Sequence, residues 1–303
     1  MNQAGILVAI LVVEAGVGYP RKWHHPVMTV GVMIAAAERR WNHGGHRRRR
    51  TAGAVLLFLL ILVPAIMGSV IEQLAQGAWG VVLIVLAGSI GLAQRSLHDH
   101  VVAVQVPLST GDLPAARAAV AMIVGRDTAS LDEAGVATAA IESLAESFCD
   151  GVVAPAFWFL LAGLPGLFAA KAINTADSMV GHRTDELRWF GWASARADDL
   201  VNWVPARLAG GLICLAGGSG WQTMGRDARY HASPNGGWPE AAMAGTLGRS
   251  LGGPVHYGGE LAMRAKLGEG PLPSAADLLR ALRVYRSACM LLWCAVGGLA
   301  WAL

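Results

Sequence analysis

The sequence predicts an all-α, polytopic integral membrane protein, and its composition and its long apolar runs carry that prediction. Only 15% of the 303 residues are charged, whereas 54% are hydrophobic. An average soluble domain has about 25% charged residues, so this chain cannot coat a soluble globule of its size. A disordered chain is excluded because such chains are poor in apolar residues.

Charge-free runs give the predicted membrane helices, because a helix needs about 20 apolar residues to cross a bilayer. Four runs predict spans or deeply buried helices, at residues 51–71, 73–94, 151–170 and 208–225, and two weaker candidates lie at 1–13 and 287–303. The run at residues 1–13 has no basic region and no cleavage signature, so we expect it to be an anchor and not a removed signal peptide. Glycine and proline at 163–166 predict a broken or re-entrant helix.

Basic residues predict the orientation of these helices. Residues 21–50 hold eight Lys or Arg against the single acid Glu38. By the positive-inside rule this loop lies in the cytoplasm, as expected for a multi-pass protein of the inner (cytoplasmic) membrane. The four arginines at 47–50 also suggest a nucleic-acid patch, but no aromatic residues interleave with them, so we expect no nucleic-acid partner.

We expect one membrane-embedded domain, residues 1–303, with four regions. Residues 1–94 hold N-terminal helices and the basic loop, and residues 95–150 hold amphipathic helices, two of which are predicted near 114–125 and 131–149. Residues 151–260 carry the polar motifs of a cytoplasm-facing site, and residues 261–303 form the C-terminal helices.

Three carboxylates share one face of the helix predicted at 131–149. Glu142, Glu146 and Asp150 are spaced by four residues, and no Lys or Arg lies between Asp132 and Lys171. Since like charges on one face repel, a cation must balance them: Mg²⁺, a cationic substrate or an arginine from elsewhere. A solvated acidic stripe is the alternative.

A second polar block follows the predicted break. Lys171, Asn174 and Ser178 share a helical face, with Asp177 nearby. This set suits a phosphate or carboxylate ligand, whereas a lone lysine at this place is typical of an interfacial anchor.

A third block begins at Arg196. Asp198, Asp199 and Asn202 form an oxygen-rich set suited to a hard cation such as Mg²⁺. Arg196 and Arg207 are suited to anionic groups through bidentate contacts. Ion pairing at the membrane boundary is the alternative, although unpaired charge beside apolar sequence favours function.

The fourth block, residues 226–259, is rich in glycine and turn formers. Ser233-Pro-Asn-Gly predicts a turn, and Trp238-Pro-Glu opens a short helix. The glycines suggest backbone that approaches a ligand, although loops also collect glycine. The phosphate-loop, dinucleotide and nucleophile-elbow motifs are absent from the sequence.

Four motifs, in the same order, closely resemble the CobD/CbiB family of cobalamin-biosynthesis proteins. They are E-S-L-A-E-S-F-C-D-G from Glu142, K-x-x-N-T-x-D-S-M-V-G from Lys171, A-R-x-D-D-x-x-N-W-x-P-A-R from Ala195 and S-P-N-x-G-W-P-E from Ser233. The resemblance runs from about Glu14 to the C-terminus. It departs at Tyr19, where the family has Asp, and at Ser147, where the family usually has Asn.

The resemblance implies an adenosylcobinamide-phosphate synthase. Such an enzyme uses ATP and Mg²⁺ to join aminopropanol, or its O-phosphate, by an amide bond to adenosylcobyric acid, a corrinoid. The lipid bilayer and other enzymes of the late cobalamin pathway are the further partners that the resemblance implies.

The resemblance also implies the roles of the site residues. The catalytic set is Lys171, Asp177, Arg196, Asp199 and His231, of which His231 is a candidate base on the amine or a hydrogen-bonding spacer. The metal set is Glu142, Glu146, Asp150 and Asp198. The substrate-binding set is Asn174, Ser178, Arg183, Asn202, Arg207, Ser233, Asn235, Glu240 and Tyr257.

Two other functions stay open. A corrinoid-binding transporter should show an internal repeat, and none is found. A membrane sensor of the AmpE type would not require so many residues suited to phosphate and metal. If the four blocks form one site, the runs 151–170 and 208–225 must be re-entrant or short, so that residues 171–207 return to the cytoplasmic face.

Overall fold

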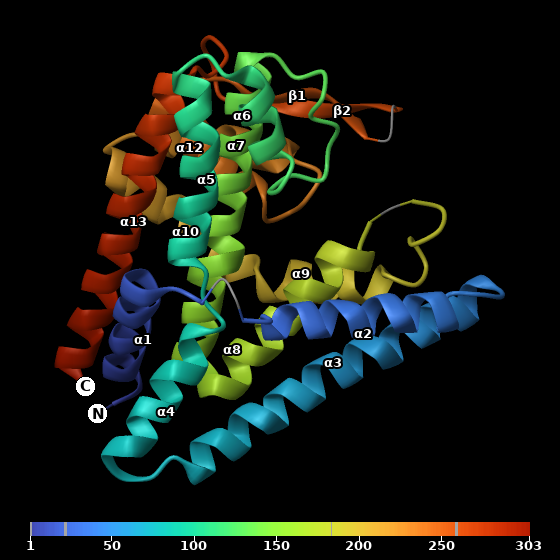
Figure 1. The fold of residues 1–303 in the computed structure, drawn as a ribbon, viewed down its shortest axis with the longest axis vertical. Coiled ribbons are helices and arrows are strands. Elements are labelled where there is room, and N and C mark those ends of the chain that lie inside the picture. Colours follow the sequence, from blue (N-terminus) through green and yellow to red (C-terminus); the bar gives the residue numbers. More distant parts are fainter. Residues whose placement is uncertain (1, 21–22, 183, 258–259) are drawn as a thin grey trace. The chain divides into compact units, whose positions relative to one another are not determined.

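The computed structural model describes residues 2–20, 23–182, 184–257 and 260–303, without the side chains of 256–261. The described chain is helical, with one two-stranded hairpin, so the predicted helical membrane class is confirmed (Figure 1). It divides into two compact units whose segments alternate along the sequence. Met1–Ala93, Ala154–Asn202 and Val296–Leu303 make the first unit, and Gln94–Val153 and Trp203–Ala295 make the second. The expected single domain stays a prediction.

The first unit is built from helices, most of which are apolar. They are α1 (Gln3–Val17), α2 (Pro26–Trp41), α3 (His46–Leu74), α4 (Gly77–Ser89), α8 (Ala154–Val180) and α9 (Trp192–Val201). α2 begins where His25 caps the helix ahead of a proline at its first position, which is a favoured helix start. The core lies between α3 and α8, where Leu57, Leu60 and Ile173 are buried together with Phe190.

The second unit holds the remaining helices and the hairpin. The helices are α5 (Gln94–Ser109), α6 (Leu113–Val120), α7 (Glu133–Phe148), α10 (Trp203–Gly217), α11 (Trp221–Asp227), α12 (Gly237–Leu247) and α13 (Ala275–Ala302), whose last turns belong to the first unit. A π-helical turn, η1 (Cys149–Val153), follows α7, and a 3₁₀ turn, η2 (Ala228–Tyr230), follows α11. The two amphipathic helices predicted before residue 150 correspond to α6 and α7.

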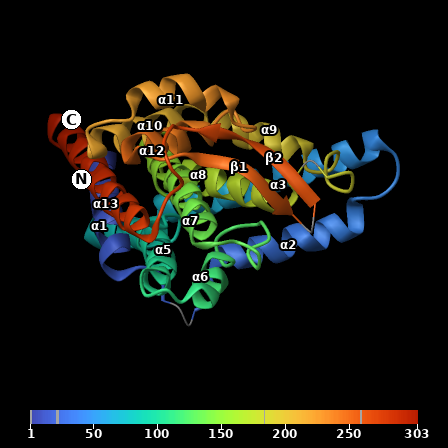
Figure 2. The same ribbon diagram turned by 90° about the horizontal axis from the view of Figure 1, so that it is seen from above.

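The antiparallel hairpin of β1 (Leu251–Tyr257) and β2 (Glu260–Leu267) was not predicted (Figure 2). Its first strand contains two glycines and a proline, which are unfavourable in strands. Its second strand alternates apolar and polar residues only over Met263–Leu267, which is the period of a half-buried strand. Because the block is rich in glycine, this short alternation was not recognised as a strand.

Four helical stretches of the described chain are long and apolar enough to cross a membrane, and a bent pair would make a fifth. They are His46–Leu74, Gly77–Ser109, Glu133–Val180 and Ala275–Ala302, and the pair is Trp192–Val201 with Trp203–Gly217, bent by 50°. The weak C-terminal candidate is thus part of a full-length apolar helix. The N-terminal candidate corresponds to α1, which has only 15 residues.

The break predicted in the run 151–170 is present in α8. Ala162 and Gly163 depart from helical geometry, and Gly163 has φ +62°, which a side chain disfavours. After the break, α8 runs antiparallel to α3. A Cβ on Gly68 of α3 would lie 2.6 Å from Pro165 N, and one on Gly53 would lie 1.8 Å from Phe190 O, so both glycines allow close helix packing.

The loop after α8 is held at the arginine-rich end of α3. Arg49 donates to the carbonyl oxygen of Glu186, and the Asn42 side chain donates to the same oxygen at 2.9 Å. The Arg50 guanidinium lies 4.0 Å over the ring of Trp192. Residues 184–192 therefore lie at the end of α3 that begins with the basic cluster, and not at its Leu74 end.

Candidate functional site

Polar residues of α8 and α9 gather in the first unit, and we call them the α8–α9 cluster: Asn174, Asp177, Arg196, Asp198, Asp199 and Asn202. Asp198 accepts hydrogen bonds from Asn202, at 3.0 Å, and from Asn174. Asp177 interacts electrostatically with Asp198 and Asp199. Arg196 pairs with Asp199 at 2.8 Å. The cluster therefore unites the second and third sequence blocks.

A close chain approach brings these two helices together. A Cβ on Gly191 would lie 1.6 Å from Val180 O, so only glycine lets the start of α9 contact the end of α8 this closely. The acidic face of α9 then meets the polar face of α8 around Asp177, which also interacts electrostatically with His182.

The α8–α9 cluster is rich in oxygen atoms and poor in positive charge. Three carboxylates face Arg196 and two amides. Mg²⁺ in phosphate-transferring sites is usually held by one or two carboxylates together with substrate oxygens and water. Among the described residues, no three His, Cys, Asp or Glu side chains converge in metal-binding geometry. Asp177, Asp198 and Asp199 supply oxygen donors of the kind that Mg²⁺ prefers, and Mg²⁺ binding at this cluster stays a prediction.

Lys171 lies on α8 one turn before Asn174, and its charge acts on the imidazole of His25. Burial lowers the pKa of His25, and the positive charge of Lys171 lowers it further. The neutral Nδ1 of His25 accepts the Val27 N–H at the start of α2. His25 is not among the site residues predicted from the sequence, and its place directly before Pro26, a favoured helix start, was the available signal.

A second group, the α7–α12 cluster, lies in the second unit: Arg126, Glu142, Glu146, His231, Glu240 and Arg264. Glu142 is buried, and its Oε2 accepts from Arg264 at 2.9 Å and also from Arg126. Its Oε1 accepts the Gly252 N–H at 2.6 Å. Of the sources of positive charge left open above, an arginine from elsewhere in the chain is the one found at Glu142.

Arg264 also joins the other members of this cluster. Its Nη2 donates to Glu240 Oε2 at 3.1 Å and lies 3.1 Å from His231 Nε2. Glu146 interacts electrostatically with Glu240, His231 and Arg264. Arg126 and Arg264 were missed in the sequence because one lies in a turn and the other in the unpredicted hairpin.

His231 is partly buried beside Glu240. Burial alone would lower the pKa of His231, but the hydrogen bond and charge of Glu240 and the charge of Glu146 raise it above its ordinary value. A histidine that retains its proton is better suited to donating a proton or pairing with an anion than to acting as a base. The candidate base role of His231 stays a prediction.

Asp150 and Arg207 have other surroundings. Asp150 lies in the π-helical turn η1 and interacts electrostatically with Glu146; such turns are frequent at functional sites. The Arg207 guanidinium lies 4.2 Å from the ring of Trp203 and 4.6 Å from that of Trp238. It also donates to Asn235 Oδ1 at 3.3 Å, so neighbouring side chains hold it in place.

The remaining predicted residues are positioned by local contacts or lie outside the description. Ser233 Oγ accepts the N–H groups of Asn235 and Gly236, each at 3.2 Å, in the predicted turn. Ser178 donates to the Asn174 carbonyl at 2.9 Å. Arg183 and the side chain of Tyr257 lie outside the described residues.

Comparisons with known proteins agree with one another. The family model described as "CobD/Cbib protein" matches residues 6–285. The chain is 47% identical to the cobalamin biosynthesis protein CobD of Rhodobacter capsulatus, covering 95% of this chain and 94% of that protein. The proteins of the same name from Brucella anthropi (45%; 89% and 86% covered) and Sinorhizobium fredii (42%; 94% and 93%) are also similar. No solved structure matches.

Proposed function

This chain belongs to the CobD/CbiB family of cobalamin-biosynthesis proteins, and we propose that it is the amide-forming ligase of that process. It joins aminopropanol, or its O-phosphate, to a propionate side chain of adenosylcobyric acid. The product is adenosylcobinamide or its phosphate, and ATP is consumed.

The chemistry requires activation of a carboxylate, which is a poor electrophile. Transfer of the γ-phosphoryl group of ATP to the propionate gives an acyl phosphate and ADP. The amine then attacks the acyl carbon, the C–N bond forms, and inorganic phosphate leaves as the amine loses a proton. Such transfers depend mainly on positioning and on positive charge near the phosphoryl oxygens.

The α8–α9 cluster supports this reaction best. Asp177 and Asp198 are the residues that would hold Mg²⁺, which when bound neutralises phosphate charge. Lys171 and Arg196 supply side-chain cations suited to phosphoryl oxygens. Glu142 of the α7–α12 cluster is less suited to holding Mg²⁺, because both of its carboxylate oxygens already accept hydrogen bonds.

The observation that carries the proposal is the return of α8 after its break. The chain turns at Gly163, and the following loop is held by Arg49 at the basic end of α3. The positive-inside rule assigns that end to the cytoplasm, where ATP is available. We therefore infer that the α8–α9 cluster faces the cytoplasm at the inner membrane.

The decisive experiment measures the product directly. Full-length protein in nanodiscs is supplied with adenosylcobyric acid, ATP and Mg²⁺, and with aminopropanol or its phosphate in separate arms. We expect equal amounts of amide product and ADP by mass spectrometry in one or both arms, which also identifies the preferred amine. If neither arm forms product, the ligase proposal fails, and an AmpE-type sensor or a transporter becomes the better hypothesis for the function of this chain.

The orientation has its own test. A single cysteine at Thr184, in a variant whose four native cysteines are replaced, should react with an impermeant maleimide only when the cytoplasmic face is exposed. In intact cells the reagent reaches only the outer face of the membrane. Labelling of the cysteine there would place the loop on the outer side and contradict the proposed cytoplasmic site.

A further inference from the structure

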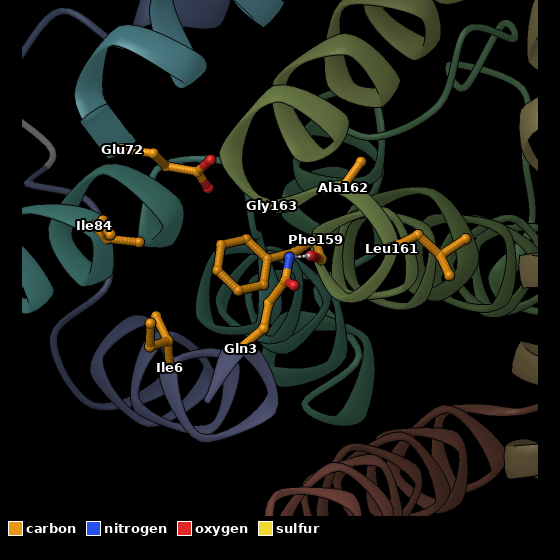
Figure 3. A pocket seen from close by; sticks show the side chains of 8 residues that line it. All are labelled: Gln3, Ile6, Glu72, Ile84, Phe159, Leu161, Ala162 and Gly163. Carbon is orange, nitrogen blue, oxygen red and sulfur yellow. Dashed lines mark hydrogen bonds between the residues drawn. The ribbon is translucent and has the colours of Figure 1, made fainter. Parts of the chain in front are cut away.

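A cavity of about 410 Å³ lies among α1, α3, α4 and α8 in the first unit (Figure 3). This volume is within the range of small-molecule pockets, which is about 300–1,000 Å³. The lining residues are Gln3, Ile6, Glu72, Ile84, Phe159, Leu161, Ala162 and Gly163. The cavity therefore lies at the break of α8 and away from the residues assigned to amide formation.

Two side chains from other helices satisfy backbone groups that the break frees. Glu72 of α3 accepts the Leu164 N–H through Oε1 at 2.7 Å. Gln3 of α1 donates through Nε2 to the Phe159 carbonyl at 2.6 Å. A Cβ at Gly163 would lie 2.2 Å from Glu72 Oε1, so the glycine admits the carboxylate. Figure 3 shows the Glu72 carboxylate directed toward the break.

The chemistry of the lining selects a cation. Among the described lining residues, Glu72 is the one ionisable side chain, and six of the eight are apolar or glycine. Oε2 of Glu72 and Oε1 of Gln3 are hydrogen-bond acceptors. The first half of α8 also ends here, and the last carbonyl groups of a helix carry partial negative charge. The occupant must therefore donate hydrogen bonds, carry positive charge and present a small apolar body.

The position along α3 relates this cavity to the membrane. Glu72 follows Arg50 by 22 residues on one helix. At 1.5 Å per residue this is about 33 Å, close to the thickness of the hydrocarbon core. An α3 that crosses the membrane would therefore place the arginines and the cavity near opposite faces, with the cavity at the level of the lipid headgroups.

We propose that this cavity binds a primary ammonium group on a short aliphatic body. Its source is either a free amino alcohol or the ethanolamine headgroup of a phospholipid. In both cases the ammonium group donates to Glu72 and Gln3, and the methylene groups contact Ile6, Ile84 and Phe159. The proposal goes beyond the ligase reaction and does not depend on it.

The test uses the full-length protein in phosphatidylcholine nanodiscs. Ethanolamine and 1-aminopropan-2-ol are titrated while thermal unfolding is followed, with choline as a probe that has the charge but no N–H donor. In a second arm, native mass spectrometry measures how much phosphatidylethanolamine the protein retains relative to phosphatidylcholine. We expect saturable stabilisation or selective retention by at least one ammonium source, and weaker binding of choline.

Glu72→Gln separates charge from structure. The glutamine oxygen can still accept the Leu164 N–H, so the helix break keeps its cap while the negative charge is lost. We expect ammonium binding at least tenfold weaker in this variant and unchanged in the matched control Glu186→Gln, an exposed acid outside the cavity.

Each outcome decides the proposal. Stabilisation by free amines alone identifies a soluble amine site, and selective retention of phosphatidylethanolamine alone identifies a headgroup site. Equal binding by wild type and Glu72→Gln, or no response of the wild type to either source, overturns it. If Glu72→Gln does not fold, Ile84→Trp, which adds bulk where Figure 3 shows the side chain facing the cavity and leaves the cap intact, must abolish binding or the proposal is wrong.

Discussion

The α8–α9 cluster and the α7–α12 cluster both contain carboxylates on helix faces, but they differ in what balances the negative charge. Glu142 receives two guanidinium groups and a backbone N–H. Asp198 receives the amides of two asparagines. A carboxylate saturated by arginines has little capacity left for a metal ion, whereas one held by neutral amides keeps its attraction for a hard cation. Carboxylates on helix faces therefore differ in chemistry according to the partners that the fold gives them.

The largest expected effect is on the stability of the α7–α12 cluster. Glu142→Ala leaves Arg126 and Arg264 facing each other in a buried place without their shared anion. Breaking a buried ion pair in this way typically costs about 3–5 kcal/mol. Chemical unfolding of the purified protein measures the loss, and Glu186→Gln serves as the exposed control.

A double variant sharpens this prediction. If the arginines are destabilising only because Glu142 is gone, then adding Arg126→Met to Glu142→Ala should recover part of the lost stability. A Glu142→Ala protein as stable as the wild type would show that the ion pairs do not hold this cluster together.

The next effect is on activity and should arise in the α8–α9 cluster. Asp198→Asn removes one negative charge but keeps the side-chain shape, so we expect amide formation to fall about 100-fold, equivalent to about 2.7 kcal/mol of barrier. The Mg²⁺ concentration needed for half-maximal rate should rise, while the stability changes little. Asp185→Asn, on the exposed loop, is the matched control. Unchanged Mg²⁺ dependence in Asp198→Asn would argue against a metal role for this residue.

The smallest effect concerns two histidines whose pKa values shift in opposite directions. The pKa of His231 is raised, so the stability it contributes is complete below its unfolded pKa of about 6.5 and is lost as pH rises through the folded value. The pKa of His25 is lowered, so its contribution is present above about pH 6.5 and is lost as pH falls through the folded value.

Two variants separate these contributions. Relative to the wild type, His231→Gln should lose more stability on the acid side of this window, and His25→Asn should lose more on the alkaline side. Thermal unfolding between pH 5 and pH 8 provides the measurement. The same pH trend in both variants would contradict the different electrostatic surroundings of the two clusters.

The local parts of the fold were predictable because they depend on composition and on short spacings. The charge-free run before Gln73 became α3, and Gly163 with Pro165 marked the break in α8. The hairpin was missed because its glycines and proline are poor strand formers, and its pairing with the rest of the second unit is a long-range feature. Arg264 was missed with it.

The sequence alone determined the membrane class, the basic end of α3, the four polar motifs and the family. These properties depend on residue types and on spacings of a few positions, so they do not require knowledge of long-range contacts. Only the tertiary structure decided which partner each carboxylate receives. Arg264 is 122 residues from Glu142, and Glu72 is 92 residues from Leu164. Contacts at such separations follow from how helices pack and where α8 turns back, which no local pattern specifies.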